Sequence, residues 1–463
     1  MFVTEGLEKK VMNSPESLPI GGREPNKFDY KEVWYPIFFL DDLEKGKLHR
    51  FTLLEEDLVV WWDERGKQWR VFADKCPHRL VPLSQGRVNE EGFLECPYHG
   101  WAFTGEGNCA IIPQEVPGVK SHESPRACVK SYPTAVAHGM LFVYPGKREN
   151  ASSTPLPLVT PLIDNGEDWI IVKTFRDVPY DAITLLENVL DASHVPYTHH
   201  GTVGNRKYAT SMNLQVESSD RQGFRGFWPE GPRRGTLGSQ YTTFVAPNLM
   251  WHDLTSPNLG RTMTVVYATP ITRGKCRLFA LFPFQFKSKI PKLLVKLTPR
   301  WYSHINQNKI LEEDQIFLHY QERYLEGKGG SSNYNKVCYL PTKADLFVAE
   351  FRKWVDRYGE VFPDKPFPPT PSDEELLERY HSHTKHCASC RGALATIKKL
   401  RFFSLLVFGL SLSATPLLSF YHSFSLSIFL SFLTLAGFLS YSGLGKLEKE
   451  FYHGQLIPKR NQM

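Results

Sequence analysis

The sequence predicts an α+β protein that ends in a pair of membrane-spanning helices. Short segments rich in β-branched and aromatic residues recur from about residue 28 to about residue 150, which is typical of a small all-β domain. Farther along, residues 308–325 carry apolar side chains at helical spacing. The run 402–445 contains no Asp, Glu, Lys or Arg, and it is long enough for two passes of about 20 residues each.

Length and composition agree with several domains and exclude one class of partner. A chain of 463 residues holds two or three domains at about 100–200 residues each. Its hydrophobic content of 41% and charged content of 22% are ordinary for globular proteins. The formal net charge of +6 is modest for this length, so the sequence predicts no nucleic-acid partner.

Residues 1–27 are expected to form a loosely ordered polar tail. They contain three prolines and no apolar signal core. Glu5 and Glu8 are unfavourable in a transit peptide, which is poor in acidic residues. We therefore expect no targeting segment in this stretch.

The all-β domain begins with three strand-like segments at 33–40, 54–63 and 68–74. The turn at 64–67 is expected to join the last two as a hairpin. After this domain, residues 151–162 contain several prolines and are typical of a linker.

Two cysteine–histidine pairs within this domain predict an iron–sulfur site. Cys76 and His78 are separated by one residue, and Cys96 and His99 follow with two residues between them. Two thiolates and two imidazoles in this pattern fit a Rieske-type [2Fe–2S] cluster, with cysteines on one iron and histidines on the other. A Cys2His2 zinc site is the alternative, but its usual spacing places the two cysteines together and the two histidines together.

A second group of candidate ligands begins at Asp191, with His194 three residues later and His199 five residues after that. Two histidines and a carboxylate on one face of Fe(II) leave open positions for O2 and substrate. These spacings do not share one face of a regular helix, and we expect Pro196 to break the helix and bring both rings together. His200 remains an alternative to His199.

A distant carboxylate should complete this iron site. The acidic run Glu312, Glu313 and Asp314 lies in the predicted helix 308–325 and is a candidate source. The alternative is a solvated, charged turn of that helix.

The C-terminal part is predicted to anchor the protein in a membrane. The uncharged run has basic residues before and after it, so the positive-inside rule places both ends of the hairpin, and the catalytic domain, on the cytosolic or stromal side. These basic residues are Lys398, Lys399, Arg401, Lys446 and Lys449. The predicted divisions are a tail (1–27), an all-β domain (28–150), a catalytic domain (160–340), a linker (341–399), a transmembrane hairpin (400–445) and a second polar tail (446–463).

The pair Cys387 and Cys390 precedes the hairpin and has three interpretations. One thiol with a lowered pKa could form a reversible disulfide with the other. Nearby His381, His383 and His386 could instead complete a metal site with the pair. Two unremarkable thiols are the third interpretation, because no strand or helix context supports a thioredoxin-type motif. The other four cysteines are scattered singly, as in a reducing compartment: Cys109, Cys128, Cys276 and Cys338.

Together these motifs resemble the Rieske non-haem iron oxygenases. The resemblance implies a helix-grip-like catalytic domain, a curved antiparallel sheet with helices, over 160–340. It assigns Asp314 as the third ligand of the iron beside His194 and His199. It also implies a homotrimer in which Asp191 accepts the electron from the Rieske ligand His99 of a neighbouring subunit.

The Cys-x-x-Cys pair before the hairpin, and the stretch from Glu56 to Val88, are most similar to the pheophorbide a oxygenase family, in particular its protochlorophyllide-dependent translocon component subgroup. The resemblance implies ferredoxin as electron donor and thioredoxin as a regulator of Cys387 and Cys390. It implies a chloroplast envelope, thylakoid or cyanobacterial membrane.

The expected function is therefore a membrane-anchored monooxygenase that uses O2 and ferredoxin electrons to oxygenate a chlorophyll-type tetrapyrrole. A phyllobilin or a non-tetrapyrrole substrate is an alternative within enzymes. A redox-sensing electron-transfer subunit of a membrane complex is the alternative from another class.

Overall fold

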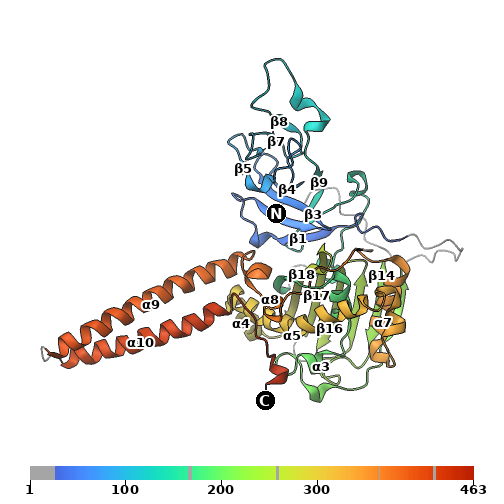
Figure 1. Cartoon of the computed structure of the whole chain (residues 1–463). Helices are drawn as coiled ribbons and strands as arrows, with labels where there is room; N and C mark the ends of the chain where they lie inside the picture. The colour runs from blue at the N-terminus through green and yellow to red at the C-terminus, as the bar shows by residue number, and fades with distance from the viewer. Residues whose placement is uncertain (1–26, 165–168, 257–259, 364, 421–423, 463) are drawn as a thin grey trace.

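The computed structural model describes residues 27–164, 169–256, 260–363, 365–420 and 424–462. Figure 1 shows three parts: a β-rich N-terminal domain, a larger domain built on one sheet, and an arm of two long helices that projects from the larger domain. The predicted N-terminal tail lies outside the described residues except for its last residue, and residues 421–423 of the predicted hairpin also lie outside them.

The N-terminal domain consists of three small antiparallel sheets, as predicted for an all-β domain. The first has the order β2 (His49–Leu53), β3 (Glu56–Asp63), β4 (Gln68–Ala73), β9 (Ser131–Tyr132). The second has the order β1 (Tyr35–Phe39), β11 (Met140–Val143), β10 (Thr134–Ala137). The third has the order β5 (Arg87–Val88), β6 (Leu94–Glu95), β7 (Ala102–Phe103), β8 (Cys109–Ile111).

The predicted hairpin between β3 and β4 is confirmed, with Asp63 opposite Gln68 at its closed end. The buried carboxylate of Asp63 accepts hydrogen bonds from the backbone N–H groups of Arg65 and Gly66, both at 3.0 Å. Its other oxygen accepts from Arg70 Nε at 2.9 Å. One aspartate therefore fixes both the turn and the register of the two strands.

The larger domain is built on one seven-stranded antiparallel sheet, which confirms the predicted α+β class. Its first and last elements in sequence, β12 and β18, pair over nine residues from Ile170–Phe284 to Val178–Cys276. In spatial order the strands are β12 (Ile170–Val178), β18 (Lys275–Phe286), β17 (Gly260–Thr272), β16 (Leu249–Ser256), β15 (Gln240–Val245), β14 (Gly223–Trp228) and β13 (Gln215–Asp220).

Side chains alternate across this sheet between two separate hydrophobic cores. On β17, Val266 and Ala268 face the helices α2 (Ala182–Leu190) and α7 (Leu346–Tyr358). Val265 and Tyr267 face the opposite way, toward β11 of the N-terminal domain and the root of the helical arm. Burial on both faces explains why the long strands β17 and β18 are almost continuously apolar.

Part of the segment 341–399, which was predicted to be a linker, is packed into this domain. Within it, α7 places Phe347, Phe351 and Trp354 in the core against the sheet. Its apolar residues recur at helical spacing, but a proline-rich stretch follows directly and obscured this signal.

The helix predicted at 308–325 is the C-terminal two-thirds of α5 (Arg300–Glu326), a helix of 27 residues. Among its buried side chains only Ile305 and Leu318 are apolar, and the others are charged or polar. Tertiary contacts, more than an apolar stripe, therefore stabilise it. Five shorter α-helices are also found among the described residues of this domain: α1 (Thr160–Asp164), α3 (Val195–Thr198), α4 (Lys289–Leu297), α6 (Tyr334–Val337) and α8 (Asp373–Leu376).

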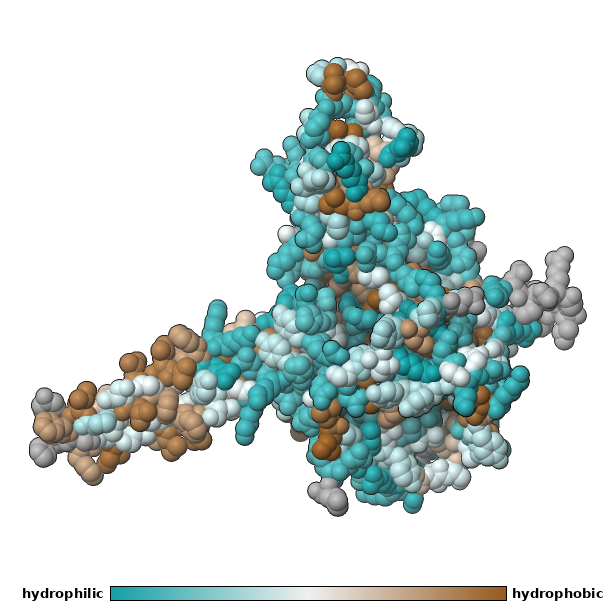
Figure 2. All heavy atoms as spheres, in the orientation of Figure 1, coloured by the Kyte–Doolittle hydropathy of each residue, from teal (hydrophilic) through white to brown (hydrophobic). Residues whose placement is uncertain are grey.

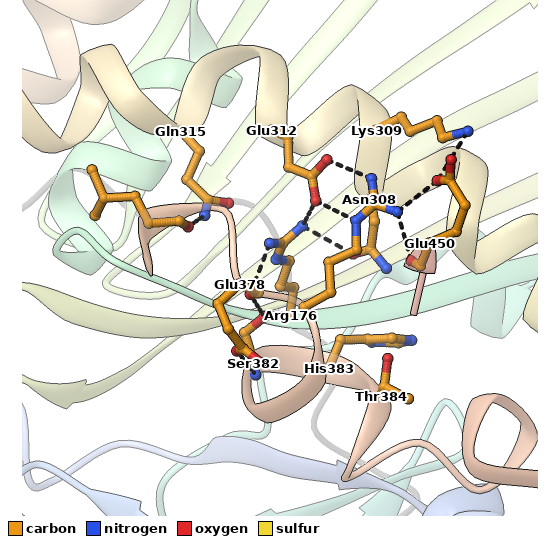
Figure 3. A network of polar contacts seen from close by, with 12 residues as sticks. Arg176, Asn308, Lys309, Glu312, Gln315, Glu378, Ser382, His383, Thr384 and Glu450 are labelled. Carbon is orange, nitrogen blue, oxygen red and sulfur yellow. Dashed lines mark hydrogen bonds and ion pairs between the residues drawn. The ribbon is translucent and has the colours of Figure 1, made fainter. Parts of the chain in front are cut away.

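Glu312 is the centre of a buried polar network that joins α5 to the sheet and to the C-terminal segments (Figure 3). It accepts from Arg176 Nη1 on β12 at 2.5 Å and from Arg379 Nε and Nη2, each at 2.6 Å. Arg379 Nη1 also donates to Glu450 beyond the second arm helix, at 2.9 Å. Burial alone would raise the pKa of Glu312, but the two guanidinium groups outweigh it and lower that pKa below its ordinary value.

Replacing Glu312 with alanine is expected to destabilise the protein by about 3–5 kcal/mol, because two buried arginines lose their shared counterion. The loss should appear as a lower midpoint in thermal unfolding followed by circular dichroism. Glu64→Ala is the matched control, since its ion pair with Lys67 lies on the exposed turn between β3 and β4. Equal midpoints for the two variants would contradict a stabilising role of the network.

The arm consists of α9 (Ala388–Phe420) and α10 (Phe424–Lys449), both long and apolar enough to cross a membrane. Figure 2 shows hydrophobic side chains along the surface of the arm, whereas the two domains are mainly hydrophilic. Gly437 lets the helices approach at Phe408, and Thr434 Oγ1 donates to Ser411 Oγ across the pair at 2.8 Å.

Candidate metal centres

The first group of predicted ligands lies on two loops of the N-terminal domain with the same backbone form. One loop follows β4 and begins at Cys76, and the other joins β6 to β7 and begins at Cys96. In each loop the fifth residue has a left-handed backbone, with φ of 59° at Leu80 and 73° at Gly100. Its N–H donates back to the cysteine carbonyl, at 2.8 Å in the first loop and 3.1 Å in the second. The two loops therefore hold their cysteines in equivalent positions.

The side chains of this group suit a cluster whose ligands attach to different irons. Cys76 and Cys96 are buried, and the rings of His78 and His99 are half-buried with centroids 4.6 Å apart. Trp101 stacks on His78 at 4.7 Å and fixes that ring. Burial raises the pKa of the Cys76 thiol to about 12, so this sulfur becomes a thiolate by binding a metal.

His78 Nδ1 is buried and has no hydrogen-bond partner among the described residues, as expected for a nitrogen that ligates a metal. A single zinc ion fits this set less well. The described residues contain two groups of at least three potential ligands whose donor atoms all lie within 4.8 Å of one another. Neither group includes Cys76, His78, Cys96 or His99.

The second predicted group lies where α2 meets the short helix α3 (Val195–Thr198). Asp191 is the C-cap residue of α2, and His194 and His199 flank α3 on either side. Pro196 lies in the first turn of α3, where proline is compatible with a helix. The expectation that Pro196 breaks a helix was therefore wrong, since this proline lies in the first turn of one. The expectation that both rings come together is confirmed.

His194, His199 and Asp314 converge, with their ligand atoms within 4.8 Å of one another. His199 Nε2 lies 3.2 Å from Asp314 Oδ2, and the two histidine rings are 5.3 Å apart. The other carboxylate oxygen, Asp314 Oδ1, is buried without a partner in the described parts of the chain. Two imidazoles, a carboxylate and this unpaired oxygen fit a facial Fe(II) site. His200 is not in this group; its Nδ1 accepts from the backbone N–H of Arg206 at 3.3 Å.

The three acids of the predicted carboxylate run are all buried, so the alternative of a solvated turn was wrong. Glu312 pairs with arginines, Asp314 joins the histidines, and Glu313 accepts from His199 Nδ1 at 2.8 Å. Thr202 Oγ1 also donates to Glu313, at 2.9 Å. The contact from Glu313 fixes the tautomer and orientation of the His199 ring, and it was not predicted from the sequence.

Iron binding at this site is expected to depend on pH. Burial opposes protonation of His199, but hydrogen bonds to Asp314 and Glu313 outweigh it and raise the pKa of the imidazole to about 9. A ligating nitrogen carries no proton, so Fe(II) uptake by demetallated protein must release one below this pKa. The apparent Fe(II) affinity, measured by titration, should fall about tenfold per pH unit below it. Glu313→Gln should shift this dependence to lower pH; an affinity independent of pH in the unmodified protein would contradict the assignment.

Asp191 lies beside this site without being one of its three converging ligands. Its Oδ1 accepts from the N–H and the hydroxyl of Ser193, at 2.7 and 2.6 Å. Its Oδ2 lies 3.7 Å from His194 Nδ1. Burial raises the pKa of Asp191, but His194 and Ser193 outweigh this effect and keep the pKa below its usual value.

A cavity of about 600 Å³ opens onto His194, His199 and Asp314. Aliphatic and aromatic side chains supply much of its lining, including Val189, Leu254, Val266, Leu278 and Phe282. His252, which also lines it, is held by Thr242 Oγ1 and by the Val189 carbonyl. The volume and the apolar character suit a sizeable organic ligand.

Comparisons with known proteins match both halves of this arrangement. The family model "Rieske [2Fe-2S] domain" matches residues 33–133, and the model "Pheophorbide a oxygenase" matches residues 244–332. Protochlorophyllide-dependent translocon component 52 of Arabidopsis thaliana is 36% identical over 82% of this chain and 76% of its own length. Pheophorbide a oxygenase of Oryza sativa subsp. japonica is 36% identical over 83% of this chain and 77% of its own.

The chain belongs to the pheophorbide a oxygenase family of Rieske oxygenases. It is therefore a Rieske non-haem iron oxygenase by family, and a [2Fe–2S] cluster and a mononuclear iron are the cofactors of that family. Flavonoid 8-hydroxylase 2 of Ocimum basilicum is also similar to this member of the family, with 34% identity over 84% of this chain and 78% of its own length.

Solved structures agree on the fold of this family member. The crystal structure of dicamba monooxygenase bound to dicamba superposes with a TM-score of 0.57, and 72% of this chain covers 98% of that one. The sequence identity is 20%, so this likeness concerns the fold alone.

The structure places Cys387 and Cys390 away from both candidate iron sites, at the start of α9. His383 lies against them, whereas His381 is exposed and His386 is outside the group. A fourth side chain in contact, His304 of α5, had not been singled out in the sequence.

Proposed function

We propose that this protein is a membrane-anchored monooxygenase that inserts oxygen from O2 into a chlorophyll-type tetrapyrrole with electrons from ferredoxin. The observation that carries this proposal is the convergence of His194, His199 and Asp314 at a largely apolar cavity of about 600 Å³. A facial two-histidine, one-carboxylate site leaves coordination positions open toward such a cavity. Names of two relatives refer to pheophorbide a and protochlorophyllide, which supports a tetrapyrrole as the ligand.

The chain's own residues would divide the work between the two sites. When bound, the cluster supplies single electrons and the iron activates O2. Cys76, His78, Cys96 and His99 would hold the cluster, and His194, His199 and Asp314 would hold the iron. Glu313 keeps His199 oriented through its Nδ1–H, and the apolar cavity wall excludes water from the substrate.

The position of the two sites supports transfer between subunits. In Figure 1 the β5–β8 sheet, which flanks the cluster loops, lies at one end of the molecule, and α3 lies at the other end. Electrons would therefore reach the iron from a neighbouring copy, as expected for a homotrimer. In that arrangement Asp191, which lies beside His194, would accept the electron from His99 of the neighbouring subunit.

The membrane position has support beyond the hairpin. The helix α4 has no buried residue, and Ile290, Leu293, Leu294 and Leu297 form one exposed apolar stripe along it. Four residues later, Trp301 packs against Phe451 just beyond the end of α10. We infer that α4 lies in the membrane interface beside the hairpin, with the catalytic domain on the stromal or cytosolic side of a chloroplast or cyanobacterial membrane.

The deciding experiment is mass spectrometry of products after incubation of the purified full-length protein with reduced ferredoxin and ¹⁸O2. The panel would contain pheophorbide a, chlorophyllide, protochlorophyllide and a phyllobilin, and His194→Ala protein would serve as the blank. Label in one closed tetrapyrrole, absent from the blank, is the expected result. Label in none of the tetrapyrroles, with an intact cluster signal by electron paramagnetic resonance, would overturn the proposed substrate class.

A flavonoid-type phenolic is the second candidate substrate, because a relative named as a flavonoid hydroxylase is 34% identical to this chain. Adding a flavone to the same panel distinguishes the two classes directly.

A further inference from the structure

Four buried side chains meet where the helical arm joins the catalytic domain. They are His304 on α5, His383 in the short helical turn Tyr380–Thr384, and Cys387 and Cys390 at the start of α9. Their ligand atoms all lie within 4.8 Å of one another, and none of the four is used in the proposed oxygenase chemistry.

The distances within this group match a tetrahedral site. His304 Nδ1 lies 3.4 Å from Cys387 Sγ and 3.5 Å from Cys390 Sγ, and His383 Nε2 lies 3.3 Å from Cys390 Sγ. The two facing ring nitrogens are 3.0 Å apart. A tetrahedron with ordinary Zn–S and Zn–N bonds has N···S edges of about 3.6 Å and an N···N edge of about 3.3 Å. Four of the six edges are thus within a few tenths of an ångström of those in a zinc tetrahedron, and the other two are no longer than 4.8 Å.

The hydrogen bonds of the outer nitrogens leave the inner nitrogen of each ring available to a metal ion. His304 Nε2 donates to the Lys173 carbonyl at 2.9 Å, and His383 Nδ1 donates to the Phe175 carbonyl at 2.6 Å. Carbonyl oxygens only accept, so each neutral ring carries its proton on the outer nitrogen and turns a lone pair inward. Two inward lone pairs at 3.0 Å repel each other, and a cation between them removes that repulsion. Backbone carbonyls behind ligating histidines are a usual feature of zinc sites.

Burial argues against a thiol switch at the same place. The relative accessibility is 0% for Cys387 and 1% for Cys390. Thiol–disulfide exchange with a protein such as thioredoxin needs an exposed sulfur for attack.

We propose that His304, His383, Cys387 and Cys390 bind one structural Zn²⁺ ion. All four positions come from the protein, so the site is closed, as in structural rather than catalytic zinc centres. Thiolate and imidazole ligands in a tetrahedron select zinc over the hard cations that prefer oxygen.

The zinc site would connect the membrane arm to α5, the helix that carries the proposed iron ligand Asp314. His304 and Asp314 lie on the same helix, about 15 Å apart along its axis. Both carbonyls behind the histidines belong to β12, which pairs with β18 of the cavity wall. Beside the site, Asp42 of the N-terminal domain accepts from the Ala388 N–H and from Arg300. One ion would thus stabilise the junction of α5, β12 and α9.

The test is metal analysis of the full-length protein, purified without added zinc, by inductively coupled plasma mass spectrometry. We expect one zinc per chain in addition to the iron. Cys390→Ser and His383→Ala should each lower the zinc content at least tenfold while the cluster signal stays. Matched controls are Cys338→Ser, a half-buried thiol elsewhere, and His381→Ala, an exposed histidine two residues from His383; both should keep the full zinc content.

Where the ligand variants do not fold, the unmodified protein still decides. Zinc at one per chain, together with two thiols that react with an alkylating reagent only after a chelator has removed the metal, supports the site. The proposal is overturned by a zinc content below one-tenth per chain, by extra iron in place of zinc, or by a Cys387–Cys390 disulfide in peptide mass spectra that thioredoxin reduces. None of these readouts depends on the substrate or on oxygenase activity.

Discussion

Replacing His194 with alanine is expected to abolish oxygenation and leave the [2Fe–2S] cluster intact. His194 contributes one of the three ligand atoms that lie within 4.8 Å of one another at the cavity, and the described residues offer no fourth ligand to this group. Removing a side chain that hydrogen-bonds to a metal ligand already lowers metal affinity or activity about 10–100-fold. Removing the ligand itself should therefore lower turnover at least about 100-fold. Product formation with reduced ferredoxin measures the first effect, and the cluster signal by electron paramagnetic resonance measures the second.

His200→Ala is the matched control for this prediction. His200 is next to the ligand His199 in sequence, but its Nδ1 accepts from the Arg206 backbone. It should therefore keep both the iron content and turnover. An equal loss of turnover in His194→Ala and His200→Ala would mean that His194 acts by stabilising the fold of this loop. Full turnover in His194→Ala would instead favour an electron-transfer subunit over an enzyme.

The candidate ligands that the sequence singles out are those whose spacing is fixed by a local turn. Cys76 and His78, or Cys96 and His99, lie within one loop, so the chain geometry of a few residues brings their side chains together. Asp191, His194 and His199 follow each other across the end of α2 and the start of α3 in the same way. Such patterns survive in the sequence because no long-range contact is needed to form them.

The contacts that were missed join segments that are distant in the sequence. His304 meets His383 across 79 positions, and Glu313 meets His199 across 114. Neither side chain has a local motif, because a histidine or glutamate on a charged helix is ordinarily a surface residue. Glu312 is similar, since its arginine Arg176 lies 136 residues earlier. A single sequence therefore shows which residues of a site are brought together by a local turn. For the residues that come from distant segments, it shows only their types and not their contacts.

Asp191→Asn is expected to retain both metals and to slow electron transfer between them at least about 100-fold, the upper range for an outer partner of a metal ligand. Asparagine keeps the size of the side chain and can still accept from Ser193, but it loses the negative charge beside His194. Oxidation of the pre-reduced cluster after mixing with O2 and substrate, followed by stopped-flow absorbance, reports this step directly. Asp220→Asn, an exposed carboxylate at the turn between β13 and β14, should leave the rate unchanged.

The negative charge of Asp191 determines how strongly its side chain accepts hydrogen bonds, and Asp191→Asn removes only this charge. The lowered pKa of Asp191 keeps the carboxylate ionised at neutral pH, 3.7 Å from His194 Nδ1 of its own chain. In the proposed trimer this charge would also accept an N–H from the cluster ligand His99 of the neighbouring subunit. A neutral amide oxygen accepts more weakly, so the proposed contact between subunits should loosen in this variant. Mixed trimers of Asp191→Asn and Cys96→Ser chains test the route. Activity restored only where an intact Asp191 meets an intact cluster supports transfer between chains, whereas activity in homotrimers of Asp191→Asn chains would exclude this carboxylate from the path.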